Sequence, residues 1–108
     1  MEDGEETKYN VNYKNMEEYH CFIVSYDLCQ TNRDYHELYA ALKKFPNWGK
    51  LTESTWAVVS NTTVIEIRDQ LMRYIDSDDR LVVVKGGKAA AWNRLMAKNQ
   101  WLIDNLKL

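Results

Sequence analysis

The sequence predicts strand, helix, strand, strand, helix, strand and a terminal helix, and this order is typical of an α+β fold of the ferredoxin-like, split βαβ class. We therefore expect a four-stranded antiparallel sheet with two helices on one face, plus a C-terminal helix. The length of 108 residues, with 45% apolar and 28% charged side chains, is enough for one such domain. Small sheets of this kind usually cover their second face by dimerising or by binding a ligand, and we expect a homodimer.

Three predicted elements fill the first half of the domain. Residues 19–26, YHCFIVSY, are an almost continuous apolar and β-branched run, which predicts a strand buried on both faces. A helix over 34–45 follows, because Asp34 and Glu37 have the spacing of a capping box and apolar residues then recur at helical intervals. Residues 48–60, WGKLTESTWAVVS, are rich in strand formers with a polar break in the middle, which predicts two strands or one bent hairpin.

The second half repeats the pattern. Thr63 and Glu66 have capping-box spacing before an apolar stripe, which predicts a helix over 63–75. Residues 80–85, RLVVVK, are a second candidate for a buried strand. From about residue 89 onwards apolar residues return at helical spacing, so we expect a terminal helix, with a break possible near its centre at 99–100.

Charge and cysteine content limit the classes of protein that fit. Residues 1–18 carry six acidic and two basic side chains, and we expect a flexible acidic arm followed by a single domain over 19–108. The whole chain has a net charge of −2, but the domain carries twelve basic against ten acidic side chains, so nucleic-acid binding is not excluded. No apolar stretch approaches the ~20 residues of a membrane helix, and we expect a soluble, cytoplasmic protein with no membrane partner. Cys21 and Cys29 lack metal-site spacing, so we expect a buried thiol and a loop thiol, not a disulfide.

Asp27 is the first candidate for a chemical role. It follows the first buried strand directly, where open sheets often present polar groups to ligands. In a symmetric dimer, two copies of Asp27 could share a Mg²⁺ ion, which would activate water for attack on a phosphodiester. The alternative is that Asp27 only accepts hydrogen bonds from backbone amides at the end of the strand.

Several segments carry a family resemblance, and they are Val24–Asp27, Lys43-Lys44, Glu53–Trp56 and Asp79–Val84. With these segments the chain resembles the second CRISPR-associated protein family, a ferredoxin-like adaptation subunit. It is similar also to the SinR-like small proteins, through Arg33-Asp34-Tyr35, Ala90-Ala91-Trp92 and Trp101-Leu102. The resemblance implies a ferredoxin-like homodimer that acts as a metal-dependent nuclease or as a scaffold bridging nucleic acid, and Asp27 matches the family's metal-binding aspartate.

Two further sets of residues are candidates for the same function. The basic residues nearest to predicted strand and helix ends could contact phosphates if they converge, and otherwise form a solvated surface: Arg33, Lys43, Lys44, Lys50, Lys85 and Lys88. Polar residues of second rank are Ser25, Glu53 and Ser54. Glu53 could be a metal ligand or a base, or it could mark a hairpin bend.

The sequence thus predicts a homodimer that binds nucleic acid or nucleotide phosphates, with Mg²⁺-dependent phosphodiester cleavage as an open possibility. The alternative is a non-catalytic dimer, of mobile-element or phage type, that binds a ligand or another protein.

Overall fold

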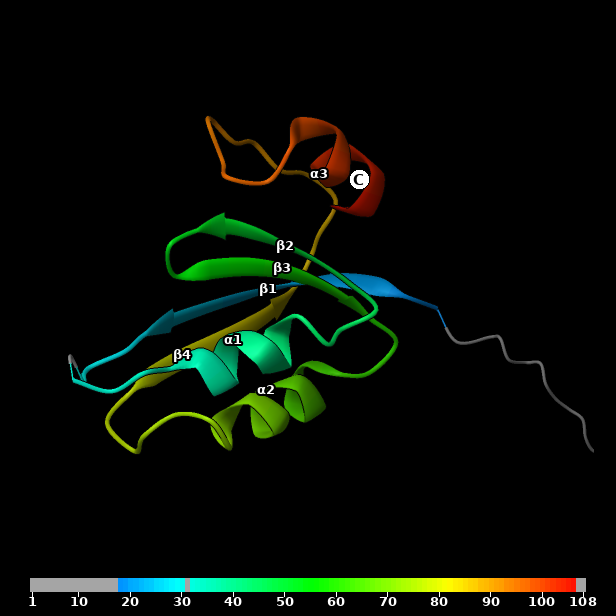
Figure 1. Cartoon of the computed structure of the whole chain (residues 1–108). Coiled ribbons are helices and arrows are strands. Elements are labelled where there is room, and N and C mark those ends of the chain that lie inside the picture. Colours follow the sequence, from blue (N-terminus) through cyan, green and yellow to red (C-terminus); the bar gives the residue numbers. More distant parts are fainter. Residues whose placement is uncertain (1–17, 31, 107–108) are drawn as a thin grey trace, which may run out of the picture.

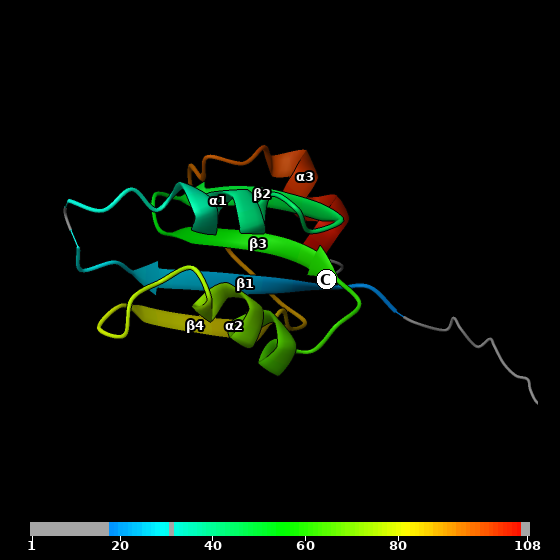
Figure 2. The same cartoon turned by 60° about the horizontal axis from the view of Figure 1, so that its bottom comes forward.

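The computed structural model describes residues 18–30 and 32–106 (Figure 1). The expected acidic arm lies, apart from residue 18, outside the described residues. The elements are β1 (His20–Asp27), α1 (His36–Leu42), β2 (Asn47–Thr52), β3 (Thr55–Ser60), α2 (Val64–Met72), β4 (Arg80–Lys85) and α3 (Asn99–Leu106). The four strands form one antiparallel sheet in the order β2-β3-β1-β4. Figure 2 shows α1 and α2 side by side on one face, and α3 lies across the sheet from them. The predicted α+β class is confirmed.

β1 is a central strand, and its neighbours explain its apolar sequence. It pairs with β3 on one side and with β4 on the other, so its backbone groups are enclosed. Phe22, Val24 and Tyr26 point toward the helices, while Cys21 packs on the opposite face. The prediction of a strand buried on both faces is confirmed.

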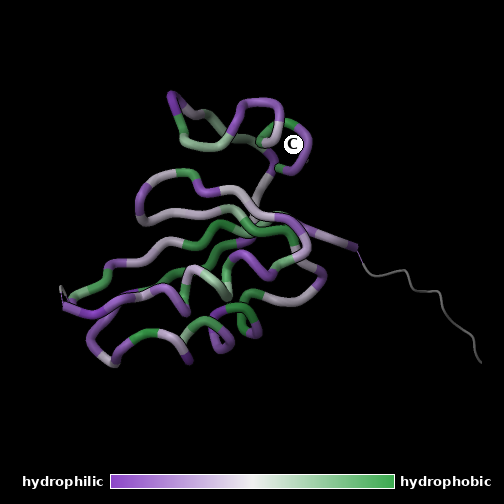
Figure 3. The backbone as a smooth tube through the Cα atoms, viewed as in Figure 1, coloured by the Kyte–Doolittle hydropathy of each residue, from purple (hydrophilic) through white to green (hydrophobic). Residues whose placement is uncertain are grey.

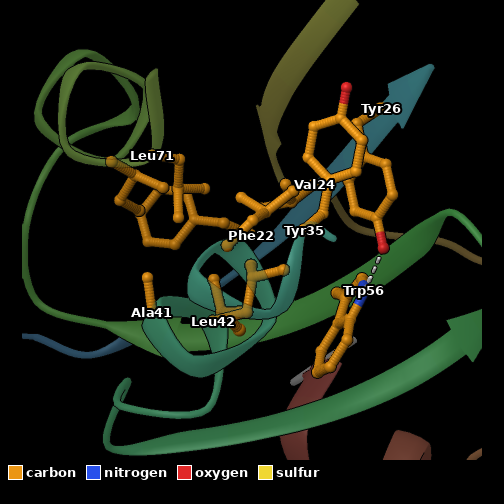
Figure 4. Close-up of a cluster of buried hydrophobic side chains, with 11 residues drawn as sticks. Phe22, Val24, Tyr26, Tyr35, Ala41, Leu42, Trp56 and Leu71 are labelled. Atoms are coloured by element: carbon orange, nitrogen blue, oxygen red, sulfur yellow. Dashed lines mark hydrogen bonds between the residues drawn. The ribbon is translucent and has the colours of Figure 1, made fainter. Parts of the chain in front are cut away.

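The main core lies between the sheet and the two helices (Figure 4). Trp56 and Phe22 are the largest of its fully buried side chains, and each is no more than 2% exposed. The Trp56 indole Nε1 donates to the Tyr26 hydroxyl at 2.9 Å, so the polar edge of the indole is satisfied inside the core. Burial raises the pKa of Tyr26, and this hydroxyl therefore stays protonated.

The two predicted capping boxes have different outcomes. The Thr63 hydroxyl accepts from the Glu66 amide, and the Glu66 carboxylate accepts from the Thr63 amide, each at 3.2 Å, so the second box is confirmed. The first is wrong: Tyr35 is the N-cap of α1, and Asp34 accepts from the His36 amide at 3.0 Å. Both helices are also shorter than predicted at their C-terminal ends, where tight turns take over from helical hydrogen bonding.

The strand over 80–85 is at an edge of the sheet, so the expectation of a fully buried strand is wrong. As the edge strand β4, it packs Leu81 and Val83 beneath the helices. Val82 and Val84 point to the second face and are 52% and 49% exposed. Successive side chains of a strand point to opposite faces, and at β4 the helices cover one face only, so the core uses every second residue of this run.

Residues 86–106, which we call the tail, lie on the second face of the sheet. The tail and the sheet bury a smaller cluster with Cys21, Leu51, Ala57 and Leu102 at its centre. Figure 3 shows hydrophobic stretches along the strands that lie between this tail and the helices. The chain thus covers part of its own second face.

The expected helix from residue 89 is wrong in extent, since 86–98 form neither helix nor strand and α3 begins at Asn99. The Met96 amide donates to the Leu51 carbonyl of β2 at 3.0 Å, a bond that a continuous helix would not allow. Arg94 has a φ of 57°, which also interrupts helical geometry. Tertiary contacts of this segment outweigh its helical spacing.

The remaining expectations concern cysteines and membranes. Cys21 is buried, Cys29 is exposed and the two form no disulfide, as predicted. Within the described part of the chain, no helix is both long and apolar enough to cross a membrane.

Candidate functional site

Asp27 lies where the sequence predicts, at the end of β1, but it has a partner that the sequence does not indicate. The β1–β4 register places it opposite Arg80, and the Arg80 guanidinium donates to its carboxylate at 2.8 Å. Both side chains are exposed. The carboxylate is therefore held in a surface ion pair with Arg80, and its predicted function as a ligand of a shared metal stays a prediction.

An acidic cluster lies at the same end of the sheet, just before β4. Carboxylate oxygens of Asp76, Asp78 and Asp79 lie within 4.8 Å of one another. Asp79 is the most constrained of the three, because it accepts from the Cys29 amide at 2.7 Å, from the Asp76 amide at 2.8 Å and from the Tyr35 hydroxyl. Desolvation opposes ionisation of Asp79, but these donors outweigh it and hold the pKa of its carboxyl below its usual value.

The other two carboxylates also bind the loop that follows β1. Asp76 pairs with Arg33, whose guanidinium also donates to the Tyr74 carbonyl at 3.0 Å. Asp78 accepts from the Gln30 side chain at 3.2 Å. The cluster thus joins the loop after β1 to the loop before β4. Three carboxylates this close together could hold a divalent cation, and here they also bind the neighbouring loop.

Cys29 contacts the same cluster without gaining reactivity. Its thiol donates to the Asp78 carbonyl at 3.1 Å. Desolvation, together with the negative charge of Asp78, raises the pKa of this thiol. It is therefore a poor nucleophile at neutral pH.

The second-rank polar residues have structural partners. Ser25 and Thr55 share a hydrogen bond of 3.2 Å across β1 and β3. Glu53 and Ser54 form the turn between β2 and β3, where the Ser54 carbonyl accepts from the Tyr26 amide at 3.0 Å. Glu53 reaches back to Lys50 at 3.5 Å. This geometry favours the hairpin-bend interpretation of Glu53.

The predicted basic residues do not form one patch. Arg33 is engaged at the acidic cluster, whereas Lys85 ends β4 and Lys88 follows it. Lys43 and Lys44 follow α1, and Lys50 lies on β2. Because β3 and β1 separate β2 from β4, Lys50 and Lys85 belong to opposite edges of the sheet. Of the predicted set, Lys43 and Lys50 converge on one group of aromatic rings.

That group is centred on Trp48 and Trp56, whose ring centroids are 5.4 Å apart. The Lys43 ammonium lies 5.7 Å from the Trp48 ring centroid. Lys50 lies 5.7 Å from Trp56 and 5.9 Å from Tyr39. Lysines at these distances from ring faces gain cation–π attraction, which fixes the ammonium groups beside the rings.

The same edge of the sheet carries a cavity of about 380 Å³, which we call the indole groove. It is lined by Trp48, Gly49, Lys50, Met96, Ala97, Lys98 and Trp101. Trp101 stands over Gly49, where an added Cβ would lie 3.0 Å from the indole, and its Nε1 donates to Asn47 at 3.1 Å. The glycine therefore lets an indole from the tail approach the strand, and this contact closes one side of the groove.

The groove lies away from Asp27. By strand register, Trp48 aligns with Phe22 of β1, five residues before Asp27, and β2 lies two strands from β1. These offsets place the two residues roughly 20 Å apart. The structure thus separates an acidic end, formed by Asp27 and the acidic cluster, from an aromatic and basic groove.

Sequence reasoning finds Lys50 but misses most of the groove. Trp48 and Trp101 are easily taken for core residues, yet Trp48 is 36% exposed. The run Trp48-Gly49-Lys50, an aromatic ring and a cation separated by glycine in a strand, is a local signal for this surface. Lys98 gives no such signal, because only the path of the tail brings it to β2.

No protein-family model matches this chain, and no solved structure matches it either. The functional argument therefore depends on the geometry of the described residues.

Proposed function

We propose that the protein is a homodimer that binds nucleic acid or nucleotides, and that it holds a single-stranded segment in the indole groove. The observation that carries the proposal is the β2 edge, where Trp48 and Lys50 lie on the helix side of the strand, Trp101 and Lys98 approach from the tail, and all four residues line one cavity. Aromatic rings stack on the face of any base, and ammonium groups attract phosphates. A volume of about 380 Å³ is in the range of small-molecule sites and accommodates a nucleobase.

We place binding at the groove and not at Asp27. Asp27 and the acidic cluster would repel a phosphodiester, while Arg33 and Arg80 are already paired with carboxylates. Because Asp27 and the acidic cluster already bind groups of the protein itself, the proposal is binding without cleavage. This choice favours the scaffold function over the nuclease function among those implied by the family resemblance.

The proposal includes the ferredoxin-like arrangement and a relationship to the SinR-like small proteins and the second CRISPR-associated family. The strand order β2-β3-β1-β4 and the two helices on one face support this arrangement. The thiols of Cys21 and Cys29, which form no disulfide, fit the reducing cytoplasm that we propose as its location.

The test is fluorescence anisotropy with labelled single-stranded RNA and DNA, using the full chain at low salt. Trp48→Ala removes one wall of the groove, and we expect binding to weaken about tenfold, because one stacked base contributes about 1–3 kcal/mol. Trp48→Phe keeps a ring and should lose less. Lys50→Gln should weaken binding by removing a phosphate contact.

Lys88→Gln is the matched control, because this exposed lysine lies outside the groove. The variant should bind the labelled strands as tightly as the wild type does. Circular dichroism of each variant checks that the fold is retained. Equal losses for Lys50→Gln and Lys88→Gln would show binding by charge alone and would contradict the proposed site.

The same reactions, run with Mg²⁺, Mn²⁺ or chelator, test cleavage. We expect an intact strand in all of them. Metal-dependent products that disappear in Asp27→Asn would overturn binding without cleavage and return the chemistry to Asp27.

A further inference from the structure

The two edges of the sheet differ in how they are protected. At the β2 edge, the tail contacts the strand, and the Met96 amide occupies the Leu51 carbonyl. At the other edge, β4 pairs only with β1 among the described residues. The interior of β4, LVVV over 81–84, contains neither proline nor a charged side chain. Proline and charged residues are features that protect an edge strand from pairing with another chain, and this strand lacks both.

Apolar side chains lie exposed on both sides of the β4 edge. Val82 and Val84 are about half exposed on the second face. On the helix side, Met72 of α2 is 52% exposed and, with Ile75 and Leu81, helps to line a cavity of about 400 Å³. Figure 2 shows α2 running beside β4, so both layers of the fold reach this edge. A partner strand placed here would bury apolar surface above and below the sheet.

The charge along β4 selects a second copy of the same chain as the partner. The strand begins next to Asp78 and Asp79 and ends at Lys85, with Lys88 just beyond. Two copies related by a two-fold axis run antiparallel, so the acidic start of each strand lies beside the basic end of the other. Arg80, the one basic residue at the acidic start, is already paired with Asp27.

We propose that β4 pairs with β4 of a second copy, antiparallel and centred on Val83, to form one continuous eight-stranded sheet. In this register, Val82 lies opposite Val84 of the partner subunit, and the two exposed valines cover each other on the second face. The inference rests on the homodimer of the proposed function and names the surface that forms it.

Sedimentation velocity of the full chain at micromolar concentration tests the interface. The wild type should sediment as a dimer, and Val82→Glu should sediment as a monomer, because it places a carboxylate against the partner's valines. Ile103→Glu is the control: Ile103 is 57% exposed on α3, away from β4, and its variant should remain dimeric. A monomeric wild type, or a dimeric Val82→Glu, overturns the proposal.

The register has its own test. Mixing Val82→Glu with Val84→Lys should restore a dimer, since the glutamate of one chain then faces the lysine of the other. Each variant alone should remain monomeric. A mixture that stays monomeric overturns the register centred on Val83.

Hydrogen exchange separates edge pairing from packing of two sheets face to face. Edge pairing protects the outward amides of residues 81–84 in the dimer and leaves them unprotected in Val82→Glu. A dimer whose β4 amides exchange as fast as those of the monomer overturns edge pairing. Anisotropy keeps the two proposals apart: a monomer that binds RNA contradicts the homodimer and its interface but not nucleic-acid binding in the groove, and a dimer that binds none contradicts only nucleic-acid binding.

Discussion

Gly86 and Gly87 are neighbours in sequence, but only the first is fixed by a close backbone approach. The Gly86 amide donates to the Cys21 carbonyl at 2.8 Å, and a Cβ on Gly86 would lie 2.9 Å from that oxygen. A Cβ on Gly87 would meet nothing within 4 Å. Gly86 therefore fixes the point where the tail leaves the sheet, whereas Gly87 is a spacer.

Gly86→Ala should lower the free energy of unfolding by about 1–3 kcal/mol, because the added methyl forces the backbone away from β1. Gly87→Ala should change it by less than about 1 kcal/mol. Urea denaturation followed by tryptophan fluorescence measures both. Equal effects of the two substitutions would show that the close approach at Gly86 does not limit stability.

Asp79 makes stability depend on pH. Its carboxyl has a lowered pKa in the folded chain, so its contribution is complete above the unfolded pKa, about 3.9, and is lost as pH falls through the folded value. Asp79→Asn should lower the melting temperature at pH 7 and flatten its decrease between about pH 4 and pH 2. Thermal melts over this pH range, with exposed Asp104→Asn as the control, measure the effect. If the melting temperature of Asp79→Asn falls with decreasing pH as steeply as that of the wild type, Asp79 is not the source of the pH dependence.

For single residues, the sequence correctly predicts that Asp27 lies at the end of a strand, but it does not predict which side chains contact Asp27. The partner Arg80 is 53 positions away, and only the β1–β4 register brings the two together. A carboxylate at a strand end predicts a metal ligand or a turn residue equally well, and neither interpretation predicts the ion pair with Arg80.

Among the elements, those specified by local contacts are the ones predicted well. The capping box of α2 is complete within four residues, and the sequence predicts it. The tail is different, because its apolar residues have helical spacing, yet the Met96–Leu51 hydrogen bond keeps residues 86–98 out of a helix. The exposure of β4 likewise depends on its position at the edge of the sheet. Local sequence does not specify the order of the strands.

Within α3, one leucine anchors the tail to the sheet. Leu102 is 1% exposed, whereas the adjacent Ile103 is 57% exposed. Leu102→Ala should lower the free energy of unfolding by about 2–5 kcal/mol through the cavity that it leaves. Ile103→Ala should have a small effect, and chemical denaturation compares the two. Similar losses would mean that α3 does not pack as described.

At the scale of the whole molecule, charge is distributed unevenly although the net value is only −2. The acidic cluster lies at one end of the sheet, and Lys43, Lys50 and Lys98 lie in or beside the indole groove. Composition therefore understates how well this chain can attract phosphate, because local potential and not net charge acts on a ligand within a Debye length.

Three ammonium groups at the groove make the affinity depend on salt to a limited extent. The logarithm of Kd for single-stranded RNA should rise with the logarithm of salt concentration with a slope of about 2, from about 0.7 counterions released per contact. Anisotropy titrations at several salt concentrations give this slope, and Lys50→Gln should reduce it. A slope near zero would exclude phosphate contacts in the groove.

The Met96–Leu51 hydrogen bond also has a consequence for assembly. A sheet with two open edges could add copies at both sides and grow into a fibre, since each added copy would expose a fresh edge. Here the tail occupies part of one edge of every copy, and the proposed pairing through β4 would use the other. In the proposed dimer, growth would therefore terminate after a single addition, so the segment that lines part of the indole groove would also limit polymerisation.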